Sequence, residues 1–495
     1  MFKLKSMALA VALACAPQAF AQDASELGKI RSEIKQLRDT YEKRIQELEK
    51  RLSEAESKAG KAEAVAGKAE SAASKAASAA DKAESAASKA EQTAYKAETT
   101  ASATANRRGE NAFNPAISLI MQGTYANTSR DPNTYQITGF VPSGGEVGPP
   151  KRSFGLGETE LNMSANIDPY FRGVAIAALA PEGGISIEEA YFQTLALPRG
   201  FTLKGGRFFS GIGYINEQHQ HAWDFQDAPL VYKAMLGNQL KQDGLQLKWV
   251  APTELFMEAG AEVSAGDQFP GSDRNKNGIG GSSVFATLGG DIGQSTAWRG
   301  GMSYLQMSPN GRSYQDVDSL GGATTNSFTG SAKMWGVNGV LKWAPNGNTT
   351  RTNFKLQGEY FRLKQDGTLN YNDTAGSNVF GSVNGSFQTS QPGWYLQGVW
   401  QFYPQWRVGY RYDSLSYSTL SNGVVNGGAG PTAADFPVLA NHSPTRNTLM
   451  LDWNPTEFSR LRLQFASDKS RLGLTDNQVF VQYIYSMGAH GAHKF

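Results

Sequence analysis

The sequence predicts an all-β transmembrane barrel of about 16 antiparallel strands, preceded by a long α-helical coiled coil. Three observations predict this fold. From Phe113 onward, apolar and polar side chains alternate at period 2 between turn residues. The connections between these strands alternate between short turns and long polar loops, which is the pattern of outer-membrane barrels. Residues 22–106 contain no proline and carry alanine at heptad spacing.

Composition excludes several classes of protein. The 495 residues include 47 Lys and Arg against 45 Asp and Glu, a net charge of +2 that gives no sign of a nucleic-acid partner. After the first 21 residues, no window offers about 18 consecutive apolar residues, so a helical membrane span is not expected. Cys15 is the only cysteine. Disulfides, zinc–thiolate sites and cysteine nucleophiles are therefore excluded from a mature chain that begins after it.

The first 21 residues have the features of a secretion signal. A basic start precedes an apolar stretch, and an Ala-Phe-Ala motif ends at Ala21. This order predicts cleavage before Gln22 and export from the cytoplasm. The alternative is a lipoprotein signal with Cys15 as the acylated residue, although Ala12 stands where such signals usually carry leucine.

Residues 22–106 are predicted to form an Ala-rich coiled coil in the periplasm. From Ala59 to Ala101, alanine recurs in alternating steps of three and four, and lysine recurs every seven residues on an outer face. Alanine is the best helix former, and small residues at both seam positions indicate closely packed parallel helices. At 1.5 Å per residue, about 75 residues span about 110 Å. The alternative is a solvated single helix or a disordered spacer.

Residues 113–495 are predicted to form the barrel in the outer membrane. We expect sixteen strands, at 117–127, 154–167, 170–180, 185–197, 201–213, 244–251, 255–265, 281–292, 296–307, 332–344, 352–364, 393–403, 405–416, 446–453, 458–468 and 478–487. An even number places both termini on the short-turn rim, which is periplasmic in such barrels. The chain ends in Phe495, similar to the signal that barrel assembly machinery reads. A soluble β-sandwich is the alternative, because it also alternates.

The long connection 214–243 is the candidate constriction. It resembles in position the third extracellular loop of general porins, which folds into the lumen. That resemblance implies that Glu217, Asp224 and Asp227 face a basic wall. We expect this wall to consist of Lys204, Lys248, Lys355, Arg407, Arg411, Arg460 and Arg462. Opposed charges across a narrow gap would sort solutes by charge. The alternative is that the arginines pair with lumen acids such as Glu158, Glu160 and Glu359 and only brace the barrel.

Two histidines in this loop raise the possibility of a metal site. His219, His221 and Asp224 offer imidazole and carboxylate ligands suited to transient zinc binding. The alternative is ordinary hydrogen-bonded histidines. No other cofactor is expected, and without a G-x-S-x-G motif or a phosphate-binding glycine loop the chain is not expected to be an enzyme. The run Asp273–Gly278 resembles half of a calcium loop, but Val284 replaces the final glutamate, so we expect an exposed loop tip.

The layout of signal, coiled coil and sixteen-stranded barrel resembles the DcaP-type trimeric porins, which take up dicarboxylic acids and similar small anions. The strings NEQHQHAWDFQDAPL, WNPTEFSRLRLQ and MGAHGAHKF resemble proteins described as zinc-regulated outer-membrane barrels. The first resemblance implies a homotrimer in outer-membrane lipid, inserted by the barrel assembly machinery. The helical region lacks the sequence complexity of a plug domain, which argues against an energised receptor.

The expected function is therefore passive diffusion of small hydrophilic solutes, anions such as carboxylates in particular, through an outer-membrane porin. The stalk would lie in the periplasm, where it could contact the cell wall. Two alternatives remain open. One is a barrel that serves zinc or metal acquisition, and the other is a trimeric adhesin. Sixteen strands in one chain argue against the adhesin, in which each chain contributes only a few.

Overall fold

The computed structural model describes residues 115–488, except 145–146, 180–182, 375–377, 379 and 426–429, together with scattered positions between 32 and 50. The chain divides into two units, Met1–Ala112 and Phe113–Phe495. The predicted signal peptide lies outside the described residues, as do His490 and His493 of the string MGAHGAHKF. So does the predicted coiled coil, apart from the positions between 32 and 50, which are helical. Within the described part of the chain, no helix is long and apolar enough to cross a membrane.

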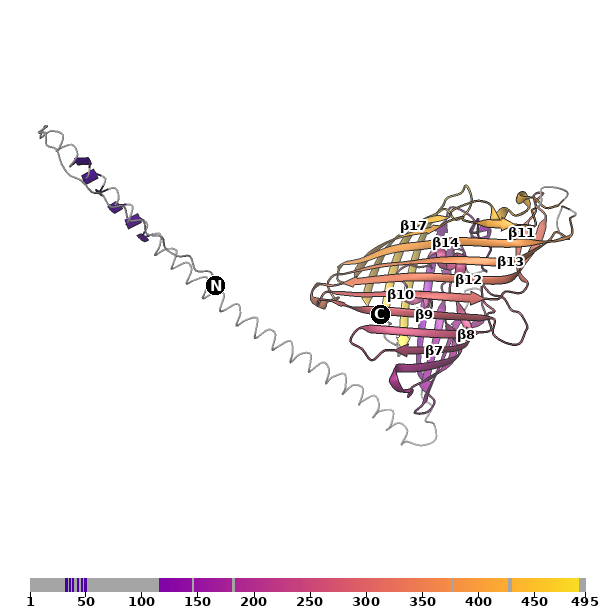
Figure 1. The fold of residues 1–495 in the computed structure, drawn as a ribbon, viewed down its shortest axis with the longest axis horizontal. Helices are drawn as coiled ribbons and strands as arrows, with labels where there is room; N and C mark the ends of the chain where they lie inside the picture. Colours follow the sequence, from indigo (N-terminus) through magenta and orange to yellow (C-terminus); the bar gives the residue numbers. More distant parts are fainter. Residues whose placement is uncertain are drawn as a thin grey trace, which may run out of the picture. The chain divides into compact units, whose positions relative to one another are not determined.

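Sixteen antiparallel strands form a closed barrel, in which each strand pairs with the next along the chain (Figure 1). They are β1 (Ala116–Thr128), β3 (Thr159–Asn166), β4 (Phe171–Leu179), β5 (Ile185–Thr194), β6 (Phe201–Phe209), β7 (Lys241–Val250), β8 (Phe256–Ser264), β9 (Gly281–Ile292), β10 (Thr296–Met307), β12 (Ala323–Trp343), β13 (Asn353–Asn372), β14 (Ser382–Tyr403), β15 (Trp406–Leu415), β17 (Thr445–Thr456), β18 (Ser459–Asp468) and β19 (Asp476–Gly488). The predicted number of strands is confirmed, and every predicted strand overlaps one of them.

Pairing between the first and last strands closes the barrel. The register runs from Ser118 opposite Gly488 to Thr128 opposite Gln478. Three short strands extend the wall beyond this ring. They are β2 (Ser153–Leu156), which pairs with β1, β11 (Arg312–Val317), which pairs with β12, and β16 (Leu420–Asn422), which pairs with β14. Closure leaves no unpaired strand edge within the ring, which a bilayer would penalise.

Three strands are much longer than the sequence predicted. β12, β13 and β14 contain 21, 20 and 22 residues, and they continue through parts of 308–331 and 365–392 that were expected to be loops. The physical reason is visible on β13. Its outward side chains change from Leu356 and Tyr360 to Lys364 and Asp366, while Leu369 faces inward and is fully buried. The apolar pattern inverts where the strand leaves lipid for water, so a search for one constant face ends too early.

The outer surface of the ring is apolar, and aromatic residues gather at the short-turn rim. Exposed aliphatic side chains recur at Leu245, Leu247, Leu288, Leu341, Leu449 and Leu461. Exposed tryptophans lie near the short turns, at Trp343, Trp400, Trp406 and Trp453. Trp406 and Trp453 stack across neighbouring strands with their ring centres 6.1 Å apart. An apolar band with an aromatic girdle is what a lipid bilayer requires of a barrel.

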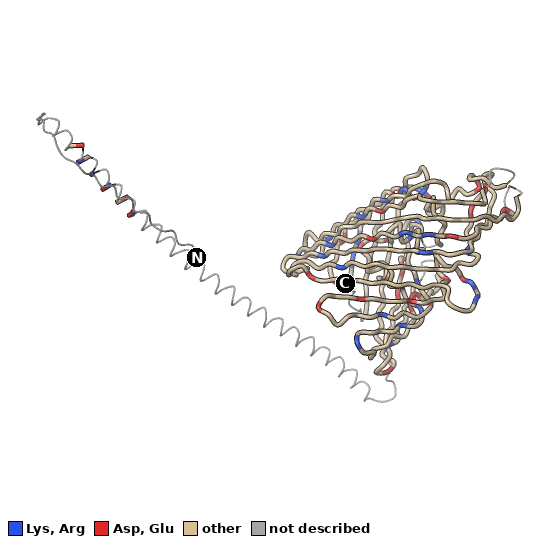
Figure 2. The backbone as a smooth tube through the Cα atoms, viewed as in Figure 1, with Lys and Arg blue, Asp and Glu red and all other residues tan. Residues whose placement is uncertain are grey.

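Charged residues recur along the strands (Figure 2), and on the segments with this apolar outer face they point inward. On β18, Arg462 and Gln464 are buried in the interior, whereas Leu461 and Phe465 are exposed on the outside. The inner face of the wall is therefore charged and polar where the outer face is apolar.

Candidate functional site: a loop bound inside the barrel

The connection between β6 and β7, residues 210–240, lies inside the barrel, and we call it the lumen loop. Ile212, Leu230 and Leu236 are at most 1% exposed. They belong to one apolar cluster with Phe361 and Leu363, which point inward from β13. A connection between two neighbouring wall strands can be buried this deeply only on the inner side. The predicted range 214–243 differs from this loop at both ends, since β6 already ends at Phe209 and residues 241–243 begin β7.

The loop contains one helix, α2 (Leu230–Leu236), and all seven of its residues are buried. Pro229 caps its start, and Gly237 ends it in a left-handed conformation with φ of 62°. Leu230 donates its backbone N–H to the Asp413 carboxylate at 3.0 Å, and Tyr232 donates its hydroxyl to Glu359 at 3.0 Å. The helix is thus tied to β15 and β13 by polar contacts within an apolar contact area.

Acidic side chains of the loop make direct ion pairs with the wall. Glu217 lies 2.6 Å from the Lys248 ammonium on β7. Asp224 pairs with Lys355 on β13 and lies 3.2 Å from Arg407 on β15. Burial by itself would raise the pKa of Asp224, but these cations hold it well below its usual range.

Asp227 is the most heavily paired acid of the loop. One carboxylate oxygen lies 3.2 Å from Arg411, and the other lies 2.7 Å from Lys233 and also contacts Arg446. Gln464 donates its amide to the same carboxylate at 3.2 Å. Burial opposes ionisation, but the three cations lower the pKa of Asp227 well below its usual range. Asp227 is therefore an anion at neutral pH, and it joins the loop to β15, β17 and β18.

Two further arginines hold the loop by its backbone. Arg462 donates to the Trp223 carbonyl at 3.0 Å and pairs with Asp452 at 2.8 Å. Arg460 donates to the carbonyls of His221 and Trp223 at 3.3 and 3.2 Å. Lys204 differs from the other predicted wall residues, because its ammonium lies over the Tyr191 ring, 4.3 Å from the centre.

These contacts change the predicted picture of the charged wall. The loop acids and the basic side chains were expected to face each other across a gap, but Glu217, Asp224 and Asp227 touch their cations directly. The alternative, in which the arginines pair with lumen acids, holds for Asp413 and Asp452 but not for Glu160 and Glu359. Glu160 contacts histidines and Glu359 contacts tyrosines, while the wall arginines pair with loop acids and with Asp413 and Asp452. Water is scarce in the buried interior, so opposite charges are stabilised better by direct contact than by facing each other across a gap.

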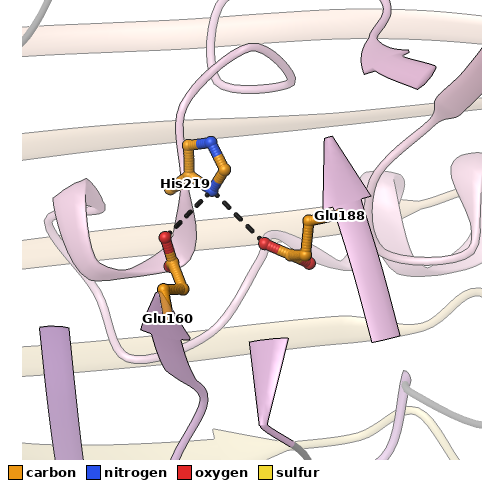
Figure 3. Close-up of side chains that lie close together, drawn as sticks. All are labelled: Glu160, Glu188 and His219. Carbon is orange, nitrogen blue, oxygen red and sulfur yellow. Dashed lines mark hydrogen bonds and ion pairs between the residues drawn. The ribbon is translucent and has the colours of Figure 1, made fainter. Parts of the chain in front are cut away.

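The two loop histidines lie against a different part of the wall, formed by β3 and β5, and Figure 3 shows His219 with Glu160 and Glu188. The rings of His219 and His221 stack with their centres 5.8 Å apart. His221 Nδ1 lies 2.8 Å from Glu160. His219 Nδ1 lies 3.2 Å from Glu160 and 3.3 Å from Glu188, and its Nε2 lies 3.1 Å from Glu189. We call these five side chains the histidine–glutamate cluster.

A β-bulge brings two neighbouring glutamates into this cluster. The register between β4 and β5 pairs Ile176 with Glu189 and Ala177 with Ile187, so Glu188 is the extra residue. Consecutive strand residues ordinarily face opposite sides, but here Glu188 and Glu189 are both buried. The bulge is the local cause of two inward carboxylates.

The carboxylates of the cluster determine the charge of His219. Burial by itself would lower the pKa of this imidazole, but Glu160, Glu188 and Glu189 raise it well above its usual range. The structure does not bring together the three predicted ligands His219, His221 and Asp224, because Asp224 pairs with Lys355 and Arg407 instead. The structure surrounds the histidines with glutamates from the wall instead.

A polar cavity of about 550 Å³ opens at the short-turn end of the interior. Its lining includes Lys342, Lys355 and Arg407 together with Asp224 and Asp291. Lys355 and Arg407 also pair with the lumen loop, so the cavity reaches the loop from this side.

Several residues of the site were not identified from the sequence. Asp452 could have been found, since it lies between the outward Leu451 and Trp453 of an alternating strand. Glu188 gave no signal, because alternation assigns it and Glu189 to opposite faces. Lys233 and Arg446 were missed because their role depends on how the loop folds back onto the wall.

No family model matches the chain. Solved structures similar to this chain include a loop L8 deletion mutant of OmpT, an outer membrane protein of Vibrio cholerae (11% identity, TM-score 0.47, covering 76% of this chain and 99% of that one). Another is the outer membrane channel DcaP of Acinetobacter baumannii (13% identity, TM-score 0.44, covering 76% and 96%). At these identities and TM-scores, the likeness concerns the course of the chain alone.

A sequence relative is closer. A protein of Aquifex aeolicus described as uncharacterized is 30% identical over 415 residues, which cover 78% of this chain and 81% of the relative. Similarity of this extent includes most of the barrel. The chain belongs to the same family as this Aquifex aeolicus protein.

Proposed function

We propose that the protein is an outer-membrane channel for passive diffusion of small hydrophilic solutes. The observation that carries the proposal is the closed sixteen-stranded ring, with an apolar outer face and a charged interior that holds the lumen loop. The outer face is suited to lipid, and inward charges are tolerated only where water or paired groups solvate them. The lumen loop then sets the width of the path.

We further propose that the path prefers anions such as carboxylates. Around Asp224 and Asp452 lie Lys355, Arg407, Arg460 and Arg462, four cations against two carboxylates. Lys355 and Arg460 keep about a fifth of their side-chain surface exposed, so solutes can reach them. A local excess of positive charge in a poorly screened lumen raises the concentration of anions there.

The proposed assembly is a homotrimer in the outer membrane, folded by the barrel assembly machinery, with residues 22–106 in the periplasm as a coiled coil that contacts the cell wall. The alanine seam of that segment supports this proposal, because small residues at both seam positions favour close parallel helices. The apolar girdle of the barrel supports the placement in lipid.

Planar bilayer recording of the purified protein tests the proposed function. We expect discrete conductance steps and a reversal potential that reports preference for anions in a salt gradient. Exchanging both Lys355 and Arg460 for alanine should lower the anion-to-cation permeability ratio. The matched control is Lys364→Ala with Arg362→Ala, which removes two cations from the outer side of β13 and should leave the ratio unchanged.

A folded protein that produces no conductance would contradict the channel proposal. Conductance with the same permeability ratio in the parent and in the Lys355→Ala, Arg460→Ala variant would retain the channel and reject the assigned anion path. Arg462 is less suitable for this test, because only 1% of its side chain is exposed and solutes cannot contact it.

A further inference from the structure

We propose that Glu160, Glu188 and His219 form a binding site for one divalent transition-metal ion, with Zn²⁺ as the best match. The three side chains come from β3, β5 and the lumen loop, and their ligand atoms all lie within 4.8 Å of one another (Figure 3). One imidazole nitrogen with two carboxylate oxygens is a donor set that suits zinc and its neighbours in the first transition row. Magnesium and calcium prefer oxygen donors alone.

The spacing of the ligand atoms fits a metal centre. His219 Nδ1 lies 3.2 Å from one oxygen of Glu160 and 3.3 Å from one oxygen of Glu188. Ligands about 2.1 Å from a tetrahedral zinc ion are about 3.4 Å apart. An ion can therefore be enclosed with small movements of these side chains, and water would supply the remaining ligand.

The neighbouring groups are those that orient metal ligands. A metal-binding imidazole commonly donates its other ring N–H to a carboxylate, which fixes the tautomer. Glu189 lies 3.1 Å from His219 Nε2 and is itself held by the Phe209 backbone N–H at 3.2 Å. With one proton held on Nε2 by Glu189, a metal ion would replace the proton on Nδ1 and bind that nitrogen between Glu160 and Glu188. His221, 2.8 Å from the other oxygen of Glu160, orients that carboxylate.

A buried oxygen points to the same ligand. Glu160 is fully buried, and its Oε2 atom has no hydrogen-bond partner although it lies 3.2 Å from His219 Nδ1. A buried carboxylate oxygen whose close contact lacks hydrogen-bond geometry is incompletely satisfied, and a metal ion bound directly to it would satisfy it better. The bulge at Glu188 adds a second carboxylate at this point, where regular alternation would have turned it to the outside. The local backbone is thus arranged to concentrate negative charge around Nδ1.

An ion at this site would join the lumen loop to two wall strands. Diffusion through the channel does not require such an ion, so the inference goes beyond the proposed function. The expected consequence is that metal binding stabilises the docked loop against opening, because the ion binds only the arrangement that brings His219 to β3 and β5.

The test is zinc binding by the full-length protein, folded in detergent and stripped with a chelator. Calorimetric titration and elemental analysis after desalting should both give one zinc per chain. Cobalt(II) in place of zinc should give visible absorption from a site that contains nitrogen. Glu188→Gln and His219→Gln should each weaken zinc binding at least tenfold. Glu189→Gln should weaken it about tenfold or more through loss of orientation.

Asp273→Asn is the matched control, because it removes one carboxylate charge at an exposed loop residue and leaves both the cluster and the loop contacts intact. Its zinc affinity should equal that of the parent. The site is refuted if the folded parent binds less than one zinc per chain, a measurement that does not depend on any variant folding. Equal affinities in the parent, Glu188→Gln and His219→Gln would also overturn it. Conductance is recorded in metal-free buffer, so the result of the zinc-binding test does not affect the test of the channel proposal.

Discussion

Replacing Asp227 with asparagine should release the lumen loop from the wall while the barrel stays folded. Asparagine keeps the shape and part of the hydrogen bonding of aspartate but carries no charge. Lys233, Arg411 and Arg446 would then lose a shared anion, although Arg411 keeps Asp413 at 3.0 Å. The contacts between wall strands do not involve Asp227, so the ring itself should be unaffected.

The size of the effect follows from the burial of these groups. Arg411 and Arg446 are 1% exposed, and the Lys233 ammonium lies 2.7 Å from Asp227. At an effective dielectric constant of about 20, two charges 3.2 Å apart attract by about 5 kcal/mol before desolvation is subtracted. Removal of one partner from a buried pair costs about 3–5 kcal/mol. The opening equilibrium of the loop should therefore rise by roughly 10²- to 10⁴-fold.

Hydrogen exchange measured by mass spectrometry reports this equilibrium directly. The amides of α2, residues 230–236, are buried in the docked loop and should exchange through its opening. We expect their protection to fall by the same factor as the opening equilibrium rises, whereas the amides of β13 and β14 stay protected. In bilayers, the same variant should show larger and noisier conductance steps.

The control is Asp273→Asn, which makes the same chemical change at an exposed loop residue. It should leave both exchange and conductance as in the parent. If α2 keeps its protection within about threefold in folded Asp227→Asn, the assigned role of the ion pairs is wrong, since even 1 kcal/mol would exceed that change.

Three further predictions concern other parts of the chain. Because the pKa of His219 is raised in the folded protein, its contribution to loop docking is complete below about pH 6.5 and is lost as pH rises through the raised value. Conductance noise should therefore increase in alkali, and His219→Gln should abolish that dependence. Mass spectrometry of protein from membranes should find Gln22 as the first residue, and an acylated Cys15 would contradict this. Deletion of 23–106 should leave an inserted barrel whose oligomer dissociates at a lower temperature, and a monomeric parent in mild detergent would oppose the trimer.

Much of the fold could be predicted from the sequence because lipid imposes a strict pattern. Alternation located all sixteen strands, and short turns, such as residues 168–169 between two predicted strands, located their ends. The lengths of β12, β13 and β14 could not be predicted, because the pattern inverts above the lipid, as it does between Leu356 and Lys364. The bulge at Glu188 was invisible for a related reason, since one inserted residue changes the face of its neighbour without any change in composition.

The residues of the candidate site could be predicted better than the contacts between them. Glu217, Asp224, Asp227 and the inward arginines follow from one loop and from strand alternation. Which acid meets which cation depends on how the loop folds, and the sequence offered no measure of that. Asp224 accordingly fits both the basic wall and the histidines in the sequence, whereas the structure pairs it with Lys355 and Arg407.

The order of charges along the lumen loop explains why it docks in one orientation. His219 and His221 come first and meet the glutamates of β3 and β5, whereas Asp224 and Asp227 follow and meet the cations of β13, β15 and β17. A reversed loop would place aspartates against glutamates and histidines against arginines. Each of those contacts would bury like charges, which costs several kcal/mol in a poorly hydrated interior. The two sectors of the wall therefore act together, and a change in either one should loosen the same loop.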